Sequence, residues 1–447
     1  MSSPHDSGDP TPEIVVRPDR PANGGEAVGR IDGQVVFVRG AVPGELIRAQ
    51  VVDDRRASFR RAEVIEILEP SPHRVVSPCD AARHGAGCCD LGYIEVSHAR
   101  TLKAQIVSDA LSRIGRFDDA DLTAAGVDDV VVRSLGDDGT GWRVRTRLGV
   151  DDDGRAGMHA FHGSRIVTGH RCAAPTPGLV DGLDDLALTP GAELAIVADM
   201  HGRRHVTELA PVAPPARRAR GRRGDRTATQ SARRRRESDR AQRVVEGDTT
   251  AAHRVGDRVW QIPVTAFWQA HRAAPGVYAD TIVGMIAAAG VRPRAGAAVA
   301  WDLYGGAGIF AAALLDQEIG GAAPAGVHVV ESDPLALASA AETFADDDRV
   351  TLHRGEVATT SAALPSPDVV VLDPPRTGAG AAVIDAVTDA DPGVIVHVGC
   401  DVGRFARDLA LFAEQGYRPR DIRAFDAFPL THHVEAIACL VPAHRGM

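Results

Sequence analysis

Residues 244–447 contain four short apolar runs that alternate with alanine-rich stretches long enough to form helices. The runs are VAWDLY at 299–304, GVHVVE at 326–331, DVVVLD at 368–373 and GVIVHV at 393–398. Continuously apolar strands separated by helices are typical of a parallel sheet with helices on both faces. We therefore expect an α/β, doubly wound (Rossmann-like) domain over residues 244–447.

Each of these runs leads directly into residues that can carry chemistry. In chain order they are the loop DLYGGAGIF at 302–310, Glu331, the loop Asp373-Pro374-Pro375-Arg376, and the segment Gly399-Cys400-Asp401. Ligands bind at the carboxyl ends of the strands in open α/β sheets. We therefore expect all four features to face a single crevice.

The glycine-rich loop and the acidic residue that follows it fit a cofactor that contains a nucleoside. Gly306 and Gly308 let the backbone approach a ligand closely, and Glu331 can accept hydrogen bonds from ribose hydroxyls. This pattern alone fits NAD and S-adenosylmethionine equally well. An aspartate before paired prolines is typical of methyltransferases that act on bases, so Asp373 favours S-adenosylmethionine. Enzymes that methylate exocyclic amines have an aromatic residue after the prolines, and Arg376 at that position disfavours this reaction.

The N-terminal half is richer in short β-type runs. Strand-like residues at 35–38, 46–52 and 63–68, with turn pairs at Asp32-Gly33 and Pro43-Gly44, predict a small β-barrel over 16–72. The remaining expected parts are a disordered tail at 1–15, a central cysteine-bearing β-rich domain at 73–97 and 125–210, a helical segment at 98–124, and an arginine-rich disordered linker or insertion at 211–243.

The net charge of −10 argues against a basic protein that coats nucleic acid. The charge is unevenly distributed, because residues 217–243 hold 12 arginines and three acidic residues, a local charge of +9. This segment predicts either a solvated linker or a site that neutralises RNA phosphates. The chain has no 18-residue apolar stretch and a polar N-terminus, so we expect a cytoplasmic protein without a membrane partner, acting as a monomer.

Six segments, in this order along the chain, resemble the RNA uridine-5-methyltransferase family. They are GGEAVGRIDGQVVFVRGAVPGE, AFWQAH at 266–271, DLYGGAGIF at 302–310, VVVLDPPRTG at 369–378, GCDVGRFARDL at 399–409 and DAFPLTHHVEAIACL at 426–440. The resemblance implies an N-terminal TRAM domain and a C-terminal class I S-adenosylmethionine-dependent domain, with the segment 98–124 packed on the catalytic domain. It also implies an RNA substrate, and ribosomal RNA is favoured over transfer RNA because the TRAM and cysteine modules occur together.

The resemblance assigns roles to individual residues. Cys400 is expected to add to C6 of a flipped uridine, which makes C5 nucleophilic, and Glu435 is expected to remove the C5 proton after methylation. Four residues are expected to bind S-adenosylmethionine, and one of them, Asp373, is expected to lie beside both the cofactor and the target base. The other three are Gln269, Tyr304 and Glu331.

Relatives in this family often carry four cysteines that hold a [4Fe–4S] cluster. The corresponding residues here are Cys79, Cys88, Cys89 and Cys172. The spacing is altered, because Ala86 stands at the first position of the usual Cys-Gly-Gly-Cys unit and Cys88 stands where glycine is expected. An iron-sulfur cluster and a degenerate site with reduced cysteines therefore both remain open.

The segment around Cys400 also departs from the family pattern. It reads Gly-Cys-Asp-Val in place of Ser-Cys-Asn-Pro, and the charge of Asp401 is expected to raise the thiol pKa. Two alternatives follow. One is a catalytically weakened relative that acts as an RNA-binding or folding factor. The other is an NAD-dependent enzyme, which leaves Cys400 and the 373–376 loop without a purpose.

Overall fold

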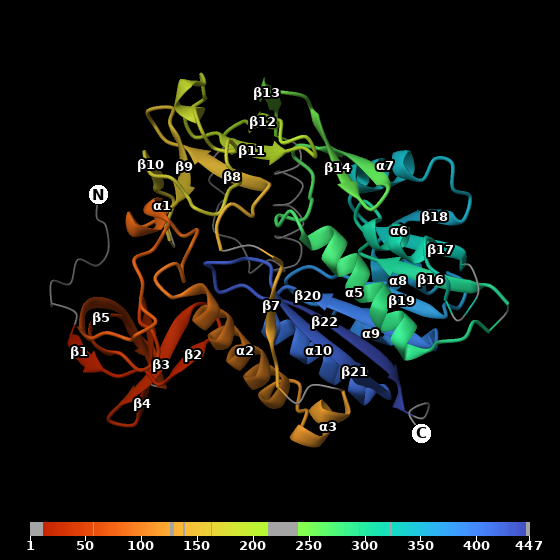
Figure 1. Ribbon diagram of the computed structural model, residues 1–447, viewed down its shortest axis with the longest axis horizontal. Coiled ribbons are helices and arrows are strands. Elements are labelled where there is room, and N and C mark those ends of the chain that lie inside the picture. The colour runs from red at the N-terminus through yellow and green to blue at the C-terminus, as the bar shows by residue number, and fades with distance from the viewer. Residues whose placement is uncertain are drawn as a thin grey trace, which may run out of the picture.

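The computed structural model describes residues 12–443 apart from 57, 126–128, 137–138, 162, 213–239, 295, 320 and 322–323. Most of the expected tail and most of the expected arginine-rich linker therefore lie outside the described residues. Within the described residues the chain forms an N-terminal sheet, a middle sheet and a large C-terminal sheet flanked by helices (Figure 1).

The N-terminal sheet has the order β1-β5-β6-β4-β3-β2. Its strands are β1 (Glu13–Val16), β2 (Arg20–Ala22), β3 (Glu26–Ile31), β4 (Gln34–Arg39), β5 (Leu46–Arg56) and β6 (Phe59–Glu69). The predicted turn at Asp32-Gly33 is confirmed, since it joins β3 to β4 with φ of 50° and 81°, the left-handed pair that a two-residue hairpin favours. β1 begins inside the stretch that composition assigned to the tail.

The middle sheet is antiparallel and has the order β10-β9-β8-β11-β12-β13. Its strands are β8 (Arg145–Val150), β9 (Ala156–His159), β10 (Ile166–Thr168), β11 (Glu193–Ala198), β12 (Arg204–Leu209) and β13 (Gln242–Glu246), with a 3-10 turn η1 (Leu183–Asp185). Gln242 and Arg243, which composition placed in the linker, thus belong to this sheet. Arg243 is held there because its guanidinium lies 2.8 Å from the Glu208 carboxylate. A hairpin of β14 (Thr250–Val255) and β15 (Arg258–Pro263) follows.

The C-terminal sheet has the order β18-β17-β16-β19-β20-β22-β21-β7. Its strands are β7 (Val132–Ser134), β16 (Ala298–Leu303), β17 (Pro324–Glu331), β18 (Val350–Arg354), β19 (Val369–Leu372), β20 (Val394–Gly399), β21 (Tyr417–Asp426) and β22 (Glu435–Pro442). All four apolar runs are confirmed as parallel strands. The winding direction of the sheet changes between β16 and β19, so a ligand crevice is expected beyond the carboxyl ends of these two strands.

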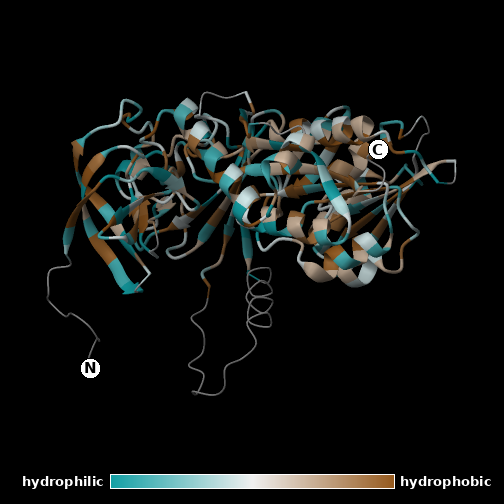
Figure 2. Cartoon of the chain, turned by 90° about the horizontal axis from the view of Figure 1, so that it is seen from below, coloured by the Kyte–Doolittle hydropathy of each residue, from teal (hydrophilic) through white to brown (hydrophobic). Residues whose placement is uncertain are grey.

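Helices cover both faces of this sheet. They are α2 (Val96–Arg113), α3 (Asp119–Ala124), α5 (Ala274–Ala289), α6 (Ile309–Leu315), α7 (Pro334–Thr343), α8 (Val357–Ser361), α9 (Ala381–Asp389) and α10 (Val402–Glu414), while a short α1 (Asp80–Arg83) lies beside the middle sheet. Along β19, Val369 and Val371 join one core and Val370 and Leu372 join the other. Both faces are buried, which is why the strand sequences are continuously apolar (Figure 2).

The sheet differs from the expected parallel sheet at one edge. β22 is antiparallel to both β20 and β21. The physical reason is the short connection 427–434, because a parallel return needs a crossover of about a dozen residues or more and this loop allows only a hairpin-type pairing. β7, from the stretch assigned to the central domain, completes the edge by pairing in parallel with β21.

Helix α2 lies between the N-terminal and C-terminal sheets and contacts β2, α10 and β21 (Figure 1). It carries Lys103, the only lysine of the chain, whose side chain is 1% exposed. The Lys103 Nζ lies 2.5 Å from Asp426 Oδ1 and 3.3 Å from the carbonyl of Phe428. Lys103 therefore fixes the start of the loop that leads from β21 to Glu435. No helix in the described part of the chain is long and apolar enough to cross a membrane.

Candidate functional site

The antiparallel insertion of β22 brings Cys400 and Glu435 to the same edge of the sheet. Cys400 follows the last residue of β20, and Glu435 is the first residue of β22. Gly399 pairs with Ala436 in the antiparallel ladder, so Cys400, which follows Gly399, lies beside Glu435, which precedes Ala436. The half-buried thiol of Cys400 thus lies beside a carboxyl that is 4% exposed.

A cavity of about 160 Å³ opens beside Cys400. Its walls come from four places in the chain, namely Asn23 after β2, Arg376, the segment Cys400–Val402, and the segment His432–Val434. The N-terminal sheet therefore contributes to the rim of a site that the C-terminal sheet builds. A narrower crevice continues from Cys400 along Pro374 and Pro375.

The charges around Cys400 oppose its ionisation. Burial raises the pKa of the Cys400 thiol to about 12, and the carboxyl groups of Glu435 and Asp373 contribute to this increase. The Arg376 guanidinium acts in the opposite direction. Burial also raises the pKa of Asp373 to about 7, and burial followed by the charge of Asp373 raises the pKa of Glu435 well above its ordinary value. At neutral pH the free protein therefore holds a neutral thiol.

Asp401 plays a different part from the one expected. It caps α10, and its side chain accepts a hydrogen bond from the backbone N–H of Arg404 at 2.9 Å. The carboxyl groups that raise the Cys400 pKa are those of Glu435 and Asp373. Gly399 has a steric reason as well, because a Cβ there would lie 2.8 Å from the ring of Phe405. Two of the departures from the family pattern, Gly399 and Asp401, therefore have a local role in the packing and capping of α10.

Asp408 of α10 forms hydrogen bonds that fix the loop carrying Arg376. The Asp408 carboxylate accepts hydrogen bonds from the backbone N–H of Ala379 at 2.7 Å and of Gly380 at 3.3 Å. His397 of β20 lies 3.4 Å from the same carboxylate. Because Asp408 is buried, these contacts fix the C-terminal end of the 373–378 loop and direct the exposed Arg376 to the cavity.

The glycine-rich loop lies at the ends of β16 and β17. The Glu331 carboxylate accepts hydrogen bonds from the backbone N–H of Gly306 at 3.1 Å and of Asp333 at 2.7 Å, and so joins the two strand ends. Gly306 has φ of 56°, and no atom lies within 4 Å of the position that a Cβ would take. Tyr304 also has a positive φ, of 58°, which turns the chain out of β16. The backbone is therefore open to a ligand at Gly306.

Asp302 and Gln269 come from elements next to this loop, since Asp302 is in β16 and Gln269 follows β15. Asp302 is fully buried, and its Oδ2 accepts a hydrogen bond from the N–H of Ala311 at 2.9 Å, while Oδ1 has no hydrogen-bond partner among the described residues. Gln269 lies half-buried in the loop between β15 and α5, and in the described part of the chain no hydrogen bond joins it to Tyr304 or Glu331. Trp260 of β15 donates to the carbonyl of Ala307 at 2.9 Å, so this hairpin is docked on the glycine-rich loop.

Comparison with known proteins identifies the family. A Corynebacterium glutamicum protein named as an uncharacterized RNA methyltransferase is 38% identical over 436 residues, which is 96% of each chain. The chain belongs to this RNA methyltransferase family. A Streptomyces coelicolor RNA methyltransferase, also uncharacterized, is 34% identical over 437 residues, 95% of this chain and 92% of the relative. No protein-family model matches the chain.

Two other similar proteins have named substrates. The 23S rRNA (uracil(1939)-C(5))-methyltransferase of Halomonas elongata is 29% identical over 447 residues, covering 94% of this RNA methyltransferase and 87% of the relative. The crystal structure of the Pyrococcus abyssi tRNA (uracil-54, C5)-methyltransferase with S-adenosyl-L-homocysteine matches with a TM-score of 0.66 and 19% identity. It covers 96% of this chain and all of that one. At that identity the match establishes the fold.

Sequence reasoning missed Tyr278 of this RNA methyltransferase, a buried residue whose pKa responds to the charges of Glu435 and Asp373. Its side chain on α5 is 1% exposed, and its hydroxyl has no hydrogen-bond partner among the described residues. Its ring lies 5.7 Å from that of Phe425, which pairs with Glu435 across β21 and β22. Burial and the charges of Glu435 and Asp373 raise its pKa well above the ordinary value. Helical periodicity alone places such a tyrosine in the core, so the sequence held no signal for it.

Phe267 is a second residue that sequence reasoning left without a role. It lies two residues before Gln269, and its side chain is 65% exposed. A large aromatic ring at a loop surface is able to stack on a base. Its position within AFWQAH was the available signal.

The raised pKa of Cys400 predicts slow alkylation of the free enzyme. A thiol reacts as the thiolate, so at pH 8 we expect iodoacetamide to label Cys400 at least about tenfold more slowly than an exposed thiol of pKa about 8.5, with a rate that rises up to pH 11. Arg376→Met removes a cation that lowers this pKa, and we expect labelling to slow by a further factor of about 3 to 10. Mass spectrometry of the Cys400 peptide measures both rates. A labelling rate that levels off below pH 9 would contradict the account.

Proposed function

We propose that this RNA methyltransferase transfers a methyl group from S-adenosylmethionine to C5 of a uridine in structured RNA, with ribosomal RNA favoured over transfer RNA. The observation that carries the proposal is the pairing of Gly399 with Ala436, which brings the Cys400 thiol and the Glu435 carboxyl together beside a cavity. Methylation at C5 of a pyrimidine requires two protein groups that act on the same target base, a nucleophile and a proton acceptor.

The proposed reaction balances with these two residues. Cys400 first loses its proton to solvent, and its thiolate Sγ then forms a bond to C6 of the uracil, which places electron density on C5, and C5 takes the methyl group while S-adenosylhomocysteine leaves. Glu435 then accepts the C5 proton, and the electrons of that C–H bond restore the C5–C6 double bond as the bond from C6 to Cys400 breaks. Cys400 leaves as the thiolate and Glu435 passes its proton to solvent, so both residues are regenerated and the sequence is balanced without a metal or redox partner.

Arg376 is proposed to favour the ionised forms that this sequence needs. Cys400 must act as a thiolate and Glu435 as a carboxylate, yet burial raises the pKa of both. Arg376 lowers the pKa of Cys400 and the pKa of Glu435, and it lines the cavity beside Cys400. S-adenosylmethionine supplies the methyl group and, when bound, a positive sulfonium charge. We expect its binding beside Asp373 to act in the same direction as Arg376.

The cofactor region fits S-adenosylmethionine. The open space above Gly306 admits a ligand against the backbone, and Glu331 lies at the adjoining strand end, where we propose that its carboxylate accepts hydrogen bonds from the ribose hydroxyls. We propose that Tyr304 and Gln269 complete this site and that Asp373 lies between cofactor and base. The similar Pyrococcus abyssi structure contains S-adenosyl-L-homocysteine, which agrees with the choice of cofactor.

We propose that RNA reaches the cavity across the N-terminal sheet, with the target uridine flipped out of its stack. Asn23 lies in the turn between β2 and β3 of that sheet and lines the cavity beside Cys400, so RNA bound there lies next to the reactive thiol. Phe267 is proposed to stack on a base near the cofactor. The arginine-rich stretch, most of which lies outside the described residues, is proposed to neutralise phosphates.

Two of the observations that suggested a catalytically weakened RNA-binding factor, the residues Gly399 and Asp401, have another explanation. Gly399 makes room for Phe405, and Asp401 caps α10, so neither departure requires a loss of activity. Membership of an RNA methyltransferase family likewise disfavours an NAD-dependent enzyme.

The test is methylation of RNA in vitro. The purified protein is incubated with methyl-labelled S-adenosylmethionine and either ribosomal RNA or transfer RNA transcripts, and the nucleosides are separated by mass spectrometry. We expect label in 5-methyluridine, with ribosomal RNA as the better substrate. Label in any other nucleoside, or RNA binding without label, would overturn the proposed reaction.

Replacing Tyr278 by phenylalanine tests whether its hydroxyl serves the reaction. The hydroxyl makes no hydrogen bond within the described residues, so we expect the free energy of unfolding to change by no more than about 1 kcal/mol. If the hydroxyl donates to the ionised Glu435, kcat should fall by about tenfold with little change in KM. Tyr278→Met, which keeps a buried apolar side chain, should behave like the phenylalanine variant. Wild-type kcat in both variants would limit Tyr278 to packing.

A further inference from the structure

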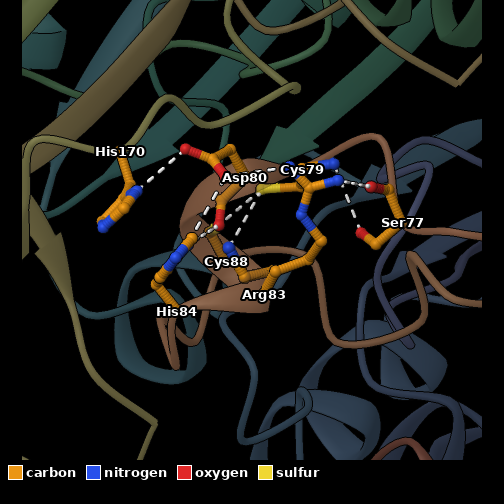
Figure 3. Close-up of polar contacts among 8 residues, drawn as sticks. Ser77, Cys79, Asp80, Arg83, His84, Cys88 and His170 are labelled. Carbon is orange, nitrogen blue, oxygen red and sulfur yellow. Dashed lines mark hydrogen bonds and ion pairs between the residues drawn. The ribbon is translucent and has the colours of Figure 1, made fainter.

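Four cysteine thiols converge at one point beside the middle sheet. Cys79 precedes α1, Cys88 and Cys89 follow it, and Cys172 comes from the loop after β10. The Sγ atoms of Cys79 and Cys88 are 3.5 Å apart, those of Cys89 and Cys172 are 3.8 Å apart, and all four lie within 4.8 Å of one another. The group is buried to half-buried, and Figure 3 shows the side of it formed by Cys79 and Cys88.

These distances do not fit the [4Fe–4S] cluster that the family resemblance implies. In such a cluster each thiolate binds a different iron at the corner of a cube, so the four cysteine sulfurs stand outside the whole cluster, about 6 Å from one another. Four thiolates that share one tetrahedral ion at a metal–sulfur distance of about 2.3 Å are instead about 3.8 Å apart. Two sulfur pairs here are 3.5 and 3.8 Å apart and no pair is more than 4.8 Å apart, so the group is more compact than the cluster requires and close to the spacing around a single ion.

We propose that Cys79, Cys88, Cys89 and Cys172 bind one tetrahedral Zn²⁺ ion as a structural site. Four thiolates leave no coordination position open for substrate, which is the arrangement of structural zinc sites. The backbone N–H of Ala82 donates to Cys79 Sγ at 3.4 Å, and such bonds favour a thiolate.

The neighbouring group of Asp80, His84 and His170 is not part of the site. The Asp80 carboxylate is already paired with Arg83 at 2.9 Å and with Nδ1 of His170 at 2.8 Å. The two imidazole rings are stacked with their centroids 3.5 Å apart (Figure 3). Asp80 therefore has its cationic and donor partners within the protein, and we assign only the four cysteines to the metal.

The residues that follow the proposed ligand Cys89 contact the loop that ends at Glu435. The residue after Cys89 is Asp90, whose carboxylate accepts a hydrogen bond from the backbone N–H of His432 at 3.1 Å and pairs with the His432 ring. The next residue, Leu91, donates its N–H to the carbonyl of Leu430 at 2.9 Å. A metal that fixes residues 88–91 therefore fixes the 427–434 loop and one wall of the cavity. The metal assignment itself does not rest on the proposed reaction.

The test is the metal content of the full-length protein purified without oxygen. We expect about one zinc per chain, no acid-labile sulfide, and a single sulfur shell near 2.3 Å in X-ray absorption at the zinc edge. Exchange for Co²⁺ should give the visible absorption bands of a tetrahedral thiolate site. Iron and sulfide at about four of each per chain would overturn the proposal, and so would a protein that binds neither zinc nor cobalt on titration.

Variants assign the ion to these cysteines. We expect Cys88→Ser and Cys89→Ser to weaken zinc retention against a chelator at least about tenfold, because each removes a thiolate ligand. Cys400→Ser is the matched control, since its thiol lies outside the group, and it should keep the wild-type zinc content. Equal zinc retention in all three variants would contradict the assignment. If the ligand variants do not fold, the absorption spectrum of the cobalt-loaded wild-type protein still decides between four thiolates and fewer.

Discussion

Cys400→Ala should lower the rate of methyl transfer to RNA by about 10⁴-fold or more, with the affinity for S-adenosylmethionine unchanged. Uracil C5 is too weakly nucleophilic to take the methyl group without the added thiolate, so little residual activity is expected. The side chain is half-buried at the end of β20, and its removal leaves the strand pairing of Gly399 with Ala436 intact. Single-turnover transfer of labelled methyl groups to RNA measures the effect.

Cys439→Ala provides the matched control. This thiol is also on the C-terminal sheet, within β22, but it is 1% exposed and its Sγ faces the carbonyl of Met285 on α5. We expect this variant to lose some stability and to keep its transfer rate within a factor of about three, since it removes no group from the cavity. Equal losses in the two variants would indicate a structural effect in both, and a fully active Cys400→Ala enzyme would exclude the thiol from the chemistry.

Glu435→Gln should separate the two halves of the reaction. Cys400 still adds and the methyl group is still transferred, but the C5 proton has no acceptor, so the bond from C6 to Cys400 persists. We expect turnover to fall by about 10²- to 10⁴-fold and a protein–RNA adduct that survives denaturation to accumulate on ordinary uridine RNA. Gel mobility under denaturing conditions measures the adduct.

The double variant Cys400→Ala, Glu435→Gln is the control for this adduct. It should form none, because Cys400 is the only sulfur-bearing residue that lines the cavity in the described part of the chain. An adduct in the double variant would show that another residue binds the RNA. A Glu435→Gln enzyme with wild-type turnover would assign proton removal elsewhere, and Asp373 is then the carboxyl to examine because its charge acts on both Cys400 and Glu435.

Much of the C-terminal fold could be predicted because its signal is local. Strands buried on both faces must be apolar along their whole length, so the runs ending near Tyr304, Glu331, Asp373 and Cys400 stood out. The carboxyl ends of parallel strands share one edge, so the sequence could predict that these four runs end at the same edge of the sheet. The role of Glu435 was different, since it depended on the family resemblance, and the structure provides the reason for its position in the antiparallel pairing of β22.

Other features depend on contacts between distant parts of the chain and left no local signal. Asn23 reaches the cavity because the N-terminal sheet packs on α2, and Lys103 is buried because it meets Asp426, more than 300 positions away in the chain. β7 and β13 joined neighbouring sheets across the boundaries that composition suggested. Edge pairing of short strands is decided by tertiary packing, so sequence periodicity could not assign them.

The four-cysteine group illustrates a limit of resemblance. The family pattern implied an iron-sulfur cluster, but the pattern of residue types does not report how far apart the sulfurs lie. The distances of 3.5 and 3.8 Å come from the way α1 and the loop after β10 meet. A cysteine at position 88 instead of position 86 is therefore consistent with our proposal that the group binds zinc in place of an iron-sulfur cluster.

The most direct test of the central claim is the reaction with RNA that contains 5-fluorouridine. Fluorine at C5 cannot be removed as a proton, so the enzyme should stop with RNA bound to its own nucleophile after methyl transfer. We predict one RNA and one methyl group per chain in an adduct that survives denaturation, with mass spectrometry locating the bond on Cys400. A methylated product released without an adduct, or an adduct on any other residue, would contradict the account.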